Sequence, residues 1–249
     1  MKISVVTPSI RPEFLPIVGK CLSRQSEQDF QWLIGTPYKL FPEYEEIDLH
    51  CEYILDPEPE KEKGDYYNLN KCWNSLFKLA KGDLIVSIVD GLWFPPDTLE
   101  KLYAHYESNP KSCITTIGHQ YDQIENGKPE HLVWTDPRAR LDQGSYYEVL
   151  YREMELCIAS FPRQAVIDVG GVDEEFDKYA ALSEKEMMAR MYKAGYKLFI
   201  DQTIEYRAIK HDRLSEEWDE RYNAGWKYFE TCMKEIEQGT RLKLAFLDQ

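Results

Sequence analysis

The sequence predicts an α/β domain in which a mixed, mostly parallel sheet related to the Rossmann arrangement carries helices on both faces. Residues 2–7 and 84–89 are short apolar runs rich in β-branched side chains, as in buried strands. Between them, the segment 67–80 places its apolar side chains on one helical face. Strands and helices follow one another as strand, helix, strand, strand, helix, strand, which is typical of one half of a doubly wound sheet.

Prolines, glycines and charged residues bound the predicted elements of the N-terminal half. Pro8 ends the first strand, and Pro12 suits the first turn of a helix that runs to Leu22. The run 84–89 is apolar on both faces, as at the centre of a parallel sheet, and Asp90 follows it. The remaining elements are strands at 30–35 and 51–55, a charged loop at 56–65, a helix at 67–80 that ends before Gly82, and a helix at 95–107.

The C-terminal half is predicted to contain a hairpin insertion and a long amphipathic helix. The polar, aromatic segment 119–148 includes Asn126-Gly127, a strong hairpin signal. An apolar stripe on the last helix either packs on the sheet or forms a face for a second copy or another partner, and we favour packing. The elements are a strand at 113–118, helices at 182–194 and 215–238, and a strand at 196–200; the stripe consists of Trp218, Tyr222, Trp226, Phe229 and Met233.

Composition and charge exclude several classes of protein. The 249 residues are 43% hydrophobic and 30% charged, which is not the composition of a disordered or fibrous chain. With 30 Lys and Arg against 44 Asp and Glu, the net charge of −14 disfavours binding to nucleic acid. The six cysteines include no CxxC pair and stand mostly among apolar neighbours, as reduced thiols do. No run approaches the roughly 20 apolar residues of a membrane span, so we expect a cytoplasmic protein.

Polar side chains gather where the first and fourth predicted strands end. Sheets of this type bind ligands in a crevice at the carboxyl ends of their strands. This rule brings the loop from Thr7 to Arg11, the loop after Ile34 and the side chain of Asp90 around one crevice. The sequence therefore predicts a ligand site at this edge of the sheet.

Three segments occur in a recognisable order along the chain. They are ISVVTPSIRPEFL at 3–15, AKGDLIVSIVDGLWFPPDTLEKL at 80–102 and ELCIASFPRQAVIDVGGVDEEFDKYAALSEKEMMARMYKAGYKLFID at 155–201. Together they resemble a family 2 type glycosyltransferase with the GT-A fold, over roughly residues 2–212. The resemblance implies a single GT-A-like domain over 1–249, with a nucleotide-sugar-binding half at 1–110, an acceptor and catalytic half at 111–212, and a C-terminal helical extension at 213–249.

The resemblance implies a binding site for a nucleotide-sugar donor. In the family, the loop after the first strand lies against the nucleotide, and the loop that here spans 170–176 closes over the donor sugar. The segment GTPYKL stands where a uridine-binding Asp is frequent, which leaves the nucleobase open, with a UDP-sugar slightly favoured. The residues implied in donor binding are Thr7, Pro8, Ser9, Arg11, Asp65, Asn70, Lys71, Asp90, Gly91, Gly171 and Asp173.

The resemblance also implies a divalent metal, Mn²⁺ or Mg²⁺, which would stabilise the departing nucleoside diphosphate. Asp90 is the expected ligand, but the triplet Asp90-Gly91-Leu92 lacks the family's second acid. His211 follows the last sheet strand, where many metal-dependent members place a His ligand, and Asp212 is an alternative. Three interpretations stay open: Asp90 binds metal with a ligand from elsewhere, Asp90 contacts the ribose or the donor sugar, or the site is degenerate.

Acidic residues near the start of the helix predicted at 182–194 are candidates for the general base. In inverting members, a carboxylate at this place removes the proton from the acceptor hydroxyl, and the helix N-terminus keeps it ionised. Glu184 and Glu186 both fit, and Glu186 would alternatively form a capping box with Ser183, so we favour Glu184. Trp93, Trp134 and Glu155 are expected on the acceptor side.

The predicted function is transfer of a sugar from a nucleotide-sugar to an acceptor hydroxyl, with inversion by a single displacement and with a divalent metal. The alternative is a catalytically degenerate GT-A-like module that binds a nucleotide or glycan, as the incomplete acidic triplet suggests. A nucleotidyltransferase is disfavoured, because TPSIRPEF contains no glycine for a phosphate loop. The acceptor stays open, and a homodimer is one expected assembly.

Overall fold

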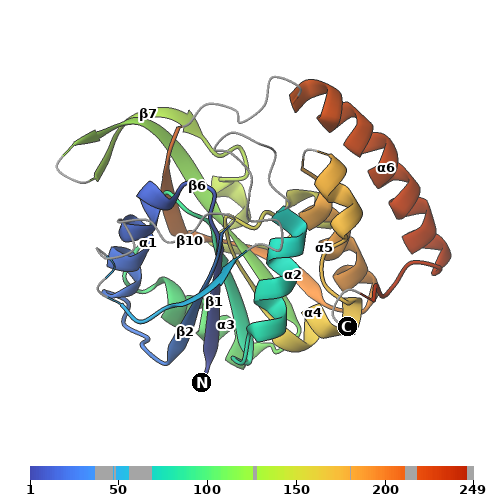
Figure 1. The fold of residues 1–249 in the computed structure, drawn as a ribbon, viewed down its shortest axis with the longest axis horizontal. Helices are drawn as coiled ribbons and strands as arrows, with labels where there is room; N and C mark the ends of the chain where they lie inside the picture. The colour runs from blue at the N-terminus through green and yellow to red at the C-terminus, as the bar shows by residue number, and fades with distance from the viewer. Residues whose placement is uncertain are drawn as a thin grey trace.

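One mixed sheet organises the part of the chain that the computed structural model describes, which comprises residues 1–36, 47, 49–55, 69–125, 128–179, 181–210 and 218–245. Within these residues the sheet has ten strands in the order β3-β2-β1-β4-β9-β6-β10-β5, with β7 paired to β6 and β8 paired to β10 (Figure 1). The strands are β1 Ile3–Pro8, β2 Phe30–Thr36, β3 Glu52–Leu55, β4 Leu84–Ile88, β5 Leu92–Trp93, β6 Ser112–Glu125, β7 Lys128–Thr135, β8 Tyr146–Glu148, β9 Ile158–Pro162 and β10 Lys197–Ile209.

Helices cover both faces of this sheet. Side chains of α2, α4 and α5 join the hydrophobic core on one face, and side chains of α1 and α3 join the core on the other. The helices are α1 Leu15–Leu22, α2 Leu69–Leu79, α3 Thr98–Ser108, α4 Arg163–Val169, α5 Ser183–Lys193 and α6 Trp218–Gln238, with 3₁₀ turns η1 Pro12–Phe14, η3 Leu141–Gln143, η4 Tyr151–Glu153 and η5 Glu174–Lys178. The predicted fold class is therefore confirmed.

The N-terminal half has the predicted parallel arrangement. Val5 of β1 lies between Trp32 of β2 and Val86 of β4, and all three side chains are buried. Both faces of β1 and β4 are covered, which explains why their sequences are apolar without alternation. The carboxyl ends of β1 and β4 thus reach the same edge of the sheet. The predicted loop at 56–65 lies outside the described residues.

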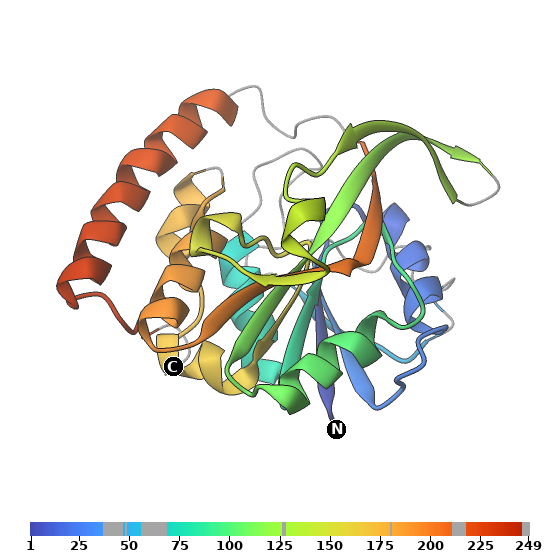
Figure 2. The same ribbon diagram turned by 180° about the vertical axis from the view of Figure 1, so that it is seen from behind.

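The C-terminal half is more antiparallel than its sequence suggests. Strand β9 pairs antiparallel with both β4 and β6, whereas β6 and β10 form a long parallel pair. The hairpin β6–β7 projects from the sheet on the same side of the molecule as α1 (Figure 2). Strand β6 extends past the predicted end at 118 because β7 pairs with its outer half. The hairpin is confirmed, although its turn at Asn126-Gly127 lies outside the described residues.

Helix α6 packs on the body of the protein through only part of its apolar stripe. Phe229 and Cys232 are buried against Phe176 of η5 and Leu182 before α5. The helix runs along the outside of α5, far from the sheet (Figure 1). The expectation that the stripe packs on the sheet is therefore wrong, because the supporting surface is α5 and η5. The Trp218 side chain lies outside the described part of the structure.

A buried cluster of charges ties the C-terminal segment to the body. Glu186 is fully buried and bonds Arg190 through both carboxylate oxygens, at 2.9 and 2.8 Å. Arg241, which follows α6, donates to Glu186 at 2.8 Å and to Asp173. Tyr228 of α6 donates to the same Asp173 carboxylate at 2.7 Å. Two buried carboxylates thus have two arginines and a phenol as partners.

The predicted capping box at the start of α5 is wrong. The residue that precedes the helix is Leu182, in the left-handed conformation with φ 78°, and no side chain caps this terminus. Ser183 is already helical, and Glu186 turns inward to Arg190 instead of back toward the first turn. An ion pair in the interior has displaced the local hydrogen bonds that the sequence pattern favours.

Asp177 caps helix α2 from a distant part of the chain. Its carboxylate accepts hydrogen bonds from the Asn70 amide and side chain, each at 2.8 Å, and from the Lys71 amide at 3.2 Å. Burial raises the pKa of Asp177 to about 6, although these hydrogen bonds oppose the rise. The free α2 amides are thereby satisfied by η5, which fixes the two segments together.

Removal of Arg241 should destabilise the fold. In the variant Arg241→Ala, Asp173 and Glu186 each lose a cationic partner in the interior, so we expect a loss of about 3 kcal/mol in the free energy of unfolding. The measurement is chemical denaturation followed by circular dichroism, with the exposed Lys234→Ala on α6 as the control. A loss no larger than that of the control would show that the cluster does not stabilise the fold.

The stability contributed by Asp177 should decrease as the pH rises. Its pKa is about 6 in the folded protein and about 3.8 when unfolded, so the folded state binds more protons between these values. This contribution is fully present below about pH 4 and is lost through pH 6, with an upper bound of about 3 kcal/mol. The unfolding free energy of the wild type relative to Asp177→Asn should therefore fall from pH 4 to pH 7. If the unfolding free energies of the wild type and Asp177→Asn changed in parallel with pH, as expected for the exposed control Asp122→Asn, the prediction would be contradicted.

Candidate functional site

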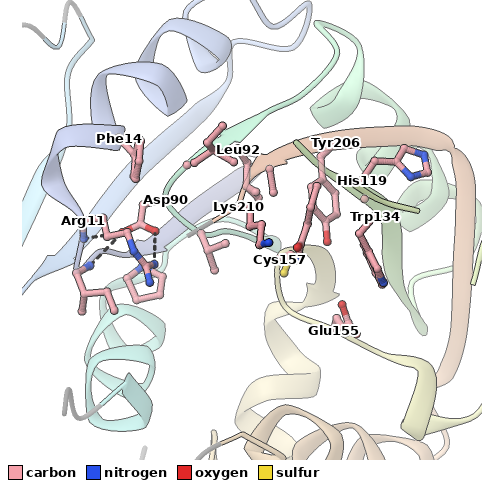
Figure 3. A pocket seen from close by; sticks show the side chains of 18 of the residues that line it. Arg11, Phe14, Asp90, Leu92, His119, Trp134, Glu155, Cys157, Tyr206 and Lys210 are labelled. Carbon is pink, nitrogen blue, oxygen red and sulfur yellow. Dashed lines mark hydrogen bonds and ion pairs between the residues drawn. The ribbon is translucent and has the colours of Figure 1, made fainter. Parts of the chain in front are cut away.

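A pocket of about 420 Å³ opens at the edge of the sheet where β1 and β4 end. Its walls come from the loop after β1, the turn after β4, the base of the β6–β7 hairpin and the outer part of β10 (Figure 3). This is the position at which the sequence predicts a crevice. The pocket brings together six of the predicted site residues, namely Pro8, Arg11, Asp90, Gly91, Trp134 and Glu155.

Asp90 fixes the loop that follows β1. One carboxylate oxygen, Oδ2, accepts hydrogen bonds from Ser9 Oγ at 3.0 Å, the Ile10 amide at 3.1 Å and the Arg11 amide at 2.9 Å. The Arg11 guanidinium lies 3.8 Å from the other oxygen, Oδ1. Gly91, with φ +74°, allows the chain to turn directly after Asp90. Burial raises the pKa of Asp90, and the charge of Arg11 and the three hydrogen bonds oppose that rise.

These contacts do not form a metal site within the described residues. Asp90 Oδ2 already has three donors, and Oδ1 lies 3.8 Å from the Arg11 guanidinium. No group of three or more His, Cys, Asp or Glu side chains suitable for a metal ion occurs in the described part of the chain. His211, the other predicted ligand, lies outside the described residues, as does Asp212.

Two cationic side chains lie on the described wall of the pocket. Arg11 approaches from the loop after β1, and Lys210 approaches from the end of β10. In Figure 3 the Lys210 ammonium points into the pocket, between the Arg11–Asp90 pair and Tyr206. Two cations at the mouth of a strand-end crevice are suited to a phosphate-bearing ligand.

The opposite wall carries a carboxylate held by a buried arginine. Arg138 forms a forked ion pair with Asp136, with Nε at 3.0 Å from Oδ1 and Nη2 at 2.6 Å from Oδ2. Burial would raise the pKa of Asp136, but the hydrogen bonds and charge of Arg138 hold it below its usual value. Arg138 Nη2 also lies 3.2 Å from Glu155, whose side chain is 41% exposed and lines the pocket. Asp136 and Arg138 therefore hold Glu155 at the wall.

Tyr206 forms much of the wall between these two sides. A Cβ atom at Gly118 would lie 2.1 Å from the Tyr206 ring, so only glycine lets the ring lie against β6. Burial raises the pKa of Tyr206 well above its usual value, and the neighbouring Cys157 and Glu155 add to the rise. Burial likewise raises the pKa of Cys157 to about 11. Both groups are neutral at physiological pH.

Three residues of the pocket were not predicted from the sequence, namely Tyr206, Cys157 and Lys210. Tyr206 and Ala208 alternate along β10 and Lys210 follows its last residue in the same spacing, a signal for one face of a strand, but the strand was expected to end at 200. The irregularity in β10 between Asp201 and Glu205 interrupts the apolar pattern and hides the outer half of the strand. Cys157 stands before β9, whose pairing partners are distant in sequence.

Several predicted donor-binding residues support the pocket or lie away from it. Thr7 is buried and accepts a hydrogen bond from Trp32 Nε1 at 3.0 Å, and Ser9 bonds Asp90. Asn70 and Lys71 contact Asp177 at the start of α2. Gly171 and Asp173 belong to the buried charged cluster, where the Gly171 carbonyl accepts from Arg190 at 2.8 Å. Asp65 lies outside the described residues.

The two predicted base residues have different surroundings. Glu186 is fully buried between Arg190 and Arg241 and does not line the pocket. Glu184, at the start of α5, is 20% exposed and lies 3.6 Å from the Lys185 ammonium. Its charge contributes to the raised pKa of Cys157, which lines the pocket. Trp93, predicted on the acceptor side, lines a neighbouring pocket instead.

Solved structures with a similar fold include glycosyltransferases. TarS from S. aureus in complex with UDP-GlcNAc superposes with a TM-score of 0.60 at 13% identity, covering 95% of this chain and 66% of that one. TarS residues 1–349 in complex with UDP gives 0.57 at 14% identity, covering 84% of this chain and 61% of that one. GalNAc-T7 with UDP, GalNAc and Mn²⁺ gives 0.64 at 11% identity, covering 86% of this chain and 44% of that one.

These comparisons bear on the fold. The chain spans about three fifths of the 1–349 fragment of TarS and less than half of GalNAc-T7. No protein-family model matches the sequence, and no curated protein is significantly similar to it. In the described part of the chain, none of the helices combines the length and apolar character that a membrane span requires. The arrangement of sheet and helices is GT-A-like, as in these glycosyltransferases.

Proposed function

We propose that this protein is a nucleotide-sugar-dependent glycosyltransferase that transfers a sugar to an acceptor hydroxyl, with inversion by a single in-line displacement. The observation that carries the proposal is the Arg11–Asp90 pair at the carboxyl ends of β1 and β4, in the pocket of a GT-A-like sheet. A UDP-sugar is the favoured donor, because TarS binds UDP and UDP-GlcNAc and GalNAc-T7 binds UDP at this level of structural similarity.

In this proposal, the described residues position and neutralise the donor. Asp90 holds the backbone of residues 9–11, so that Arg11 has one orientation at the pocket edge. Arg11 and Lys210 face the diphosphate, whose negative charge increases as the bond from the anomeric carbon to the phosphate oxygen breaks. Because Arg11 is held before the donor binds, little reorganisation is needed as this charge develops.

The acceptor hydroxyl attacks the anomeric carbon from the side opposite the departing diphosphate. Its oxygen forms the new glycosidic bond, the bonding pair to phosphate leaves with the nucleoside diphosphate, and the proton passes to a carboxylate. Glu184 is the proposed base, because it lies at a helix start and its charge acts on Cys157 of the pocket wall, while Glu186 has two arginine partners. Glu155 and Trp134 would orient the acceptor from the opposite wall.

The second candidate function is a nucleotide- or glycan-binding module without transfer activity. It is favoured by the three hydrogen bonds that occupy Asp90 Oδ2, since a carboxylate so engaged supports a loop. Both candidates bind a nucleotide in the same pocket. They differ in turnover, so an assay of sugar transfer separates them, whereas a binding assay does not.

Nucleotide binding should stabilise the protein through Arg11. At about 100 times the dissociation constant, a bound nucleotide adds about 2.7 kcal/mol, or roughly 5–10 °C in Tm for a chain of this size. We expect UDP to exceed GDP, CDP and dTDP in a thermal unfolding assay. The variant Arg11→Met should weaken UDP binding about 10- to 100-fold, whereas Arg140→Met, a control outside the pocket, should not.

The same assay with and without Mn²⁺ tests the predicted metal. A shift that requires Mn²⁺ would support Asp90 and His211 as ligands. A shift independent of Mn²⁺ would support charge neutralisation by Arg11 and Lys210. The absence of a shift with every nucleotide would contradict the proposed donor site.

Removal of the proposed base should abolish turnover and leave binding intact. Glu184→Gln removes the proton acceptor, so we expect UDP release from a UDP-sugar to fall about 10²- to 10⁴-fold with an unchanged thermal shift. Glu155→Gln is the matched variant and should mainly raise the acceptor KM. Loss of turnover in Glu155→Gln alone would make Glu155 the base. Binding without turnover in the wild type, across donors and acceptors, would support the module.

A further inference from the structure

A second pocket, with a volume of about 540 Å³, lies beside the first under the β6–β7 hairpin. It is enclosed by α1, by the segment that follows β5 and by the tip of the hairpin. The two pockets meet along the chain, since Leu92 lines the first and Trp93 the second. Trp134 at the hairpin base lines the first pocket, and Ile124 near its tip lines the second. The β6–β7 hairpin therefore contributes to the walls of both pockets.

The walls of the second pocket combine apolar side chains with cations. Lys20 and Arg24 come from one side of α1 and its C-terminal end, and Lys128 comes from the hairpin. No carboxylate lines the pocket in the described part of the chain, although the net charge of the protein is −14. The apolar lining consists of Pro16, Ile17, Trp93, Phe94, Pro96 and Ile124.

The three cations are available to a ligand. Lys20, Arg24 and Lys128 are exposed, and among the described residues none of them has an ion-pair partner. Their charge reaches the interior of the pocket: burial raises the pKa of the Cys21 thiol, and the charges of Arg24 and Lys20 oppose this rise. An anion would therefore be attracted here, against the repulsion from the rest of the surface.

We infer that this second pocket binds a single molecule of an anionic amphiphile, with its negative head on Lys20, Arg24 and Lys128 and its apolar chain on Ile17, Phe94 and Ile124. The volume lies within the usual range for small-molecule sites. A small inorganic anion would leave the apolar walls uncovered, and a neutral chain would leave the cations unused. Charge complementarity and apolar lining together thus select a ligand that has both parts.

The position of the pocket connects this ligand with the proposed reaction. An acceptor whose hydroxyl-bearing end reaches the first pocket would place its anionic and apolar parts in the second, beneath the same hairpin. This role as acceptor rests on the proposed function, whereas the binding of the amphiphile does not. The substrate class inferred is therefore an acceptor attached to an anionic, lipid-like anchor.

Isothermal titration with dodecyl phosphate, kept below its critical micelle concentration, tests the inference on the full chain. We expect binding that weakens at least about tenfold in the charge reversal Lys20→Glu/Arg24→Glu and in Ile124→Asp. The control Lys111→Glu/Lys193→Glu changes the net charge equally at exposed positions outside both pockets and should bind as the wild type does. Dodecyl maltoside, with a neutral head, and inorganic phosphate should each bind at least about tenfold more weakly.

Three results would overturn the inference: equal weakening in the control variant, equal affinity for dodecyl maltoside, or equal affinity for inorganic phosphate. Binding to vesicles containing phosphatidylglycerol without binding to the monomeric amphiphile would also overturn it, because it would indicate a membrane-facing surface instead of a pocket. The thermal shift with UDP is measured on the same variants and should not change. If UDP causes no thermal shift in the wild type, only the proposed donor site is refuted, because amphiphile binding is measured separately by titration.

Discussion

The Asp90 carboxylate organises the carboxyl-terminal edge of the sheet. β1 and β4 are hydrogen-bonded neighbours, so the loop after one strand and the turn after the other must share a small space. Asp90 fills this space with an acceptor that satisfies two backbone amides and a hydroxyl at once. A buried carboxylate without such donors would be costly, and a loop with unpaired amides would be equally costly. The pocket forms at this point because each of the two segments satisfies the polar groups of the other.

A second group of charged residues holds the C-terminal segment in place, as Asp90 holds the loop after β1. Glu186, Arg190 and Arg241 connect α5 with the chain beyond α6, and Asp173 adds the loop before η5. Glu186, a carboxylate expected near the reacting groups, is thereby one of the residues that hold the fold together. Glu184 and Glu186 share one sequence pattern, an acid in the first turn of a helix, but Glu186 is fully buried between arginines and Glu184 is partly exposed.

Local patterns were sufficient for the N-terminal half of the fold. Its strands are continuous apolar runs and its helices have one apolar face, so β1, β2, β4 and α2 were placed correctly from the sequence. The crevice and its residues Arg11 and Asp90 followed from the rule on strand ends. The metal ligands could not be judged so well, because a spacing of residue types does not show which oxygen of Asp90 is already engaged.

The rest depended on contacts between distant segments. β5 and β8 are two and three residues long and exist only through pairing with β10, so no local pattern marks them. The roles of Tyr206 and Cys157 depend in turn on the full length of β10 and on the close approach at Gly118. Long-range pairing of this kind is where sequence patterns carry least information.

Strand β6 has two parts, an inner part that is buried in the sheet and an outer part that pairs with β7. Its first seven residues are buried in the sheet, whereas most of those that follow are exposed, and β7 pairs with no other strand among the described residues (Figure 2). The hairpin therefore contributes walls to two pockets while adding little to the core that holds the fold together. Sequence change in this hairpin can alter what the protein binds at small thermodynamic cost, which makes it the segment through which ligand preference can diverge while the scaffold is retained.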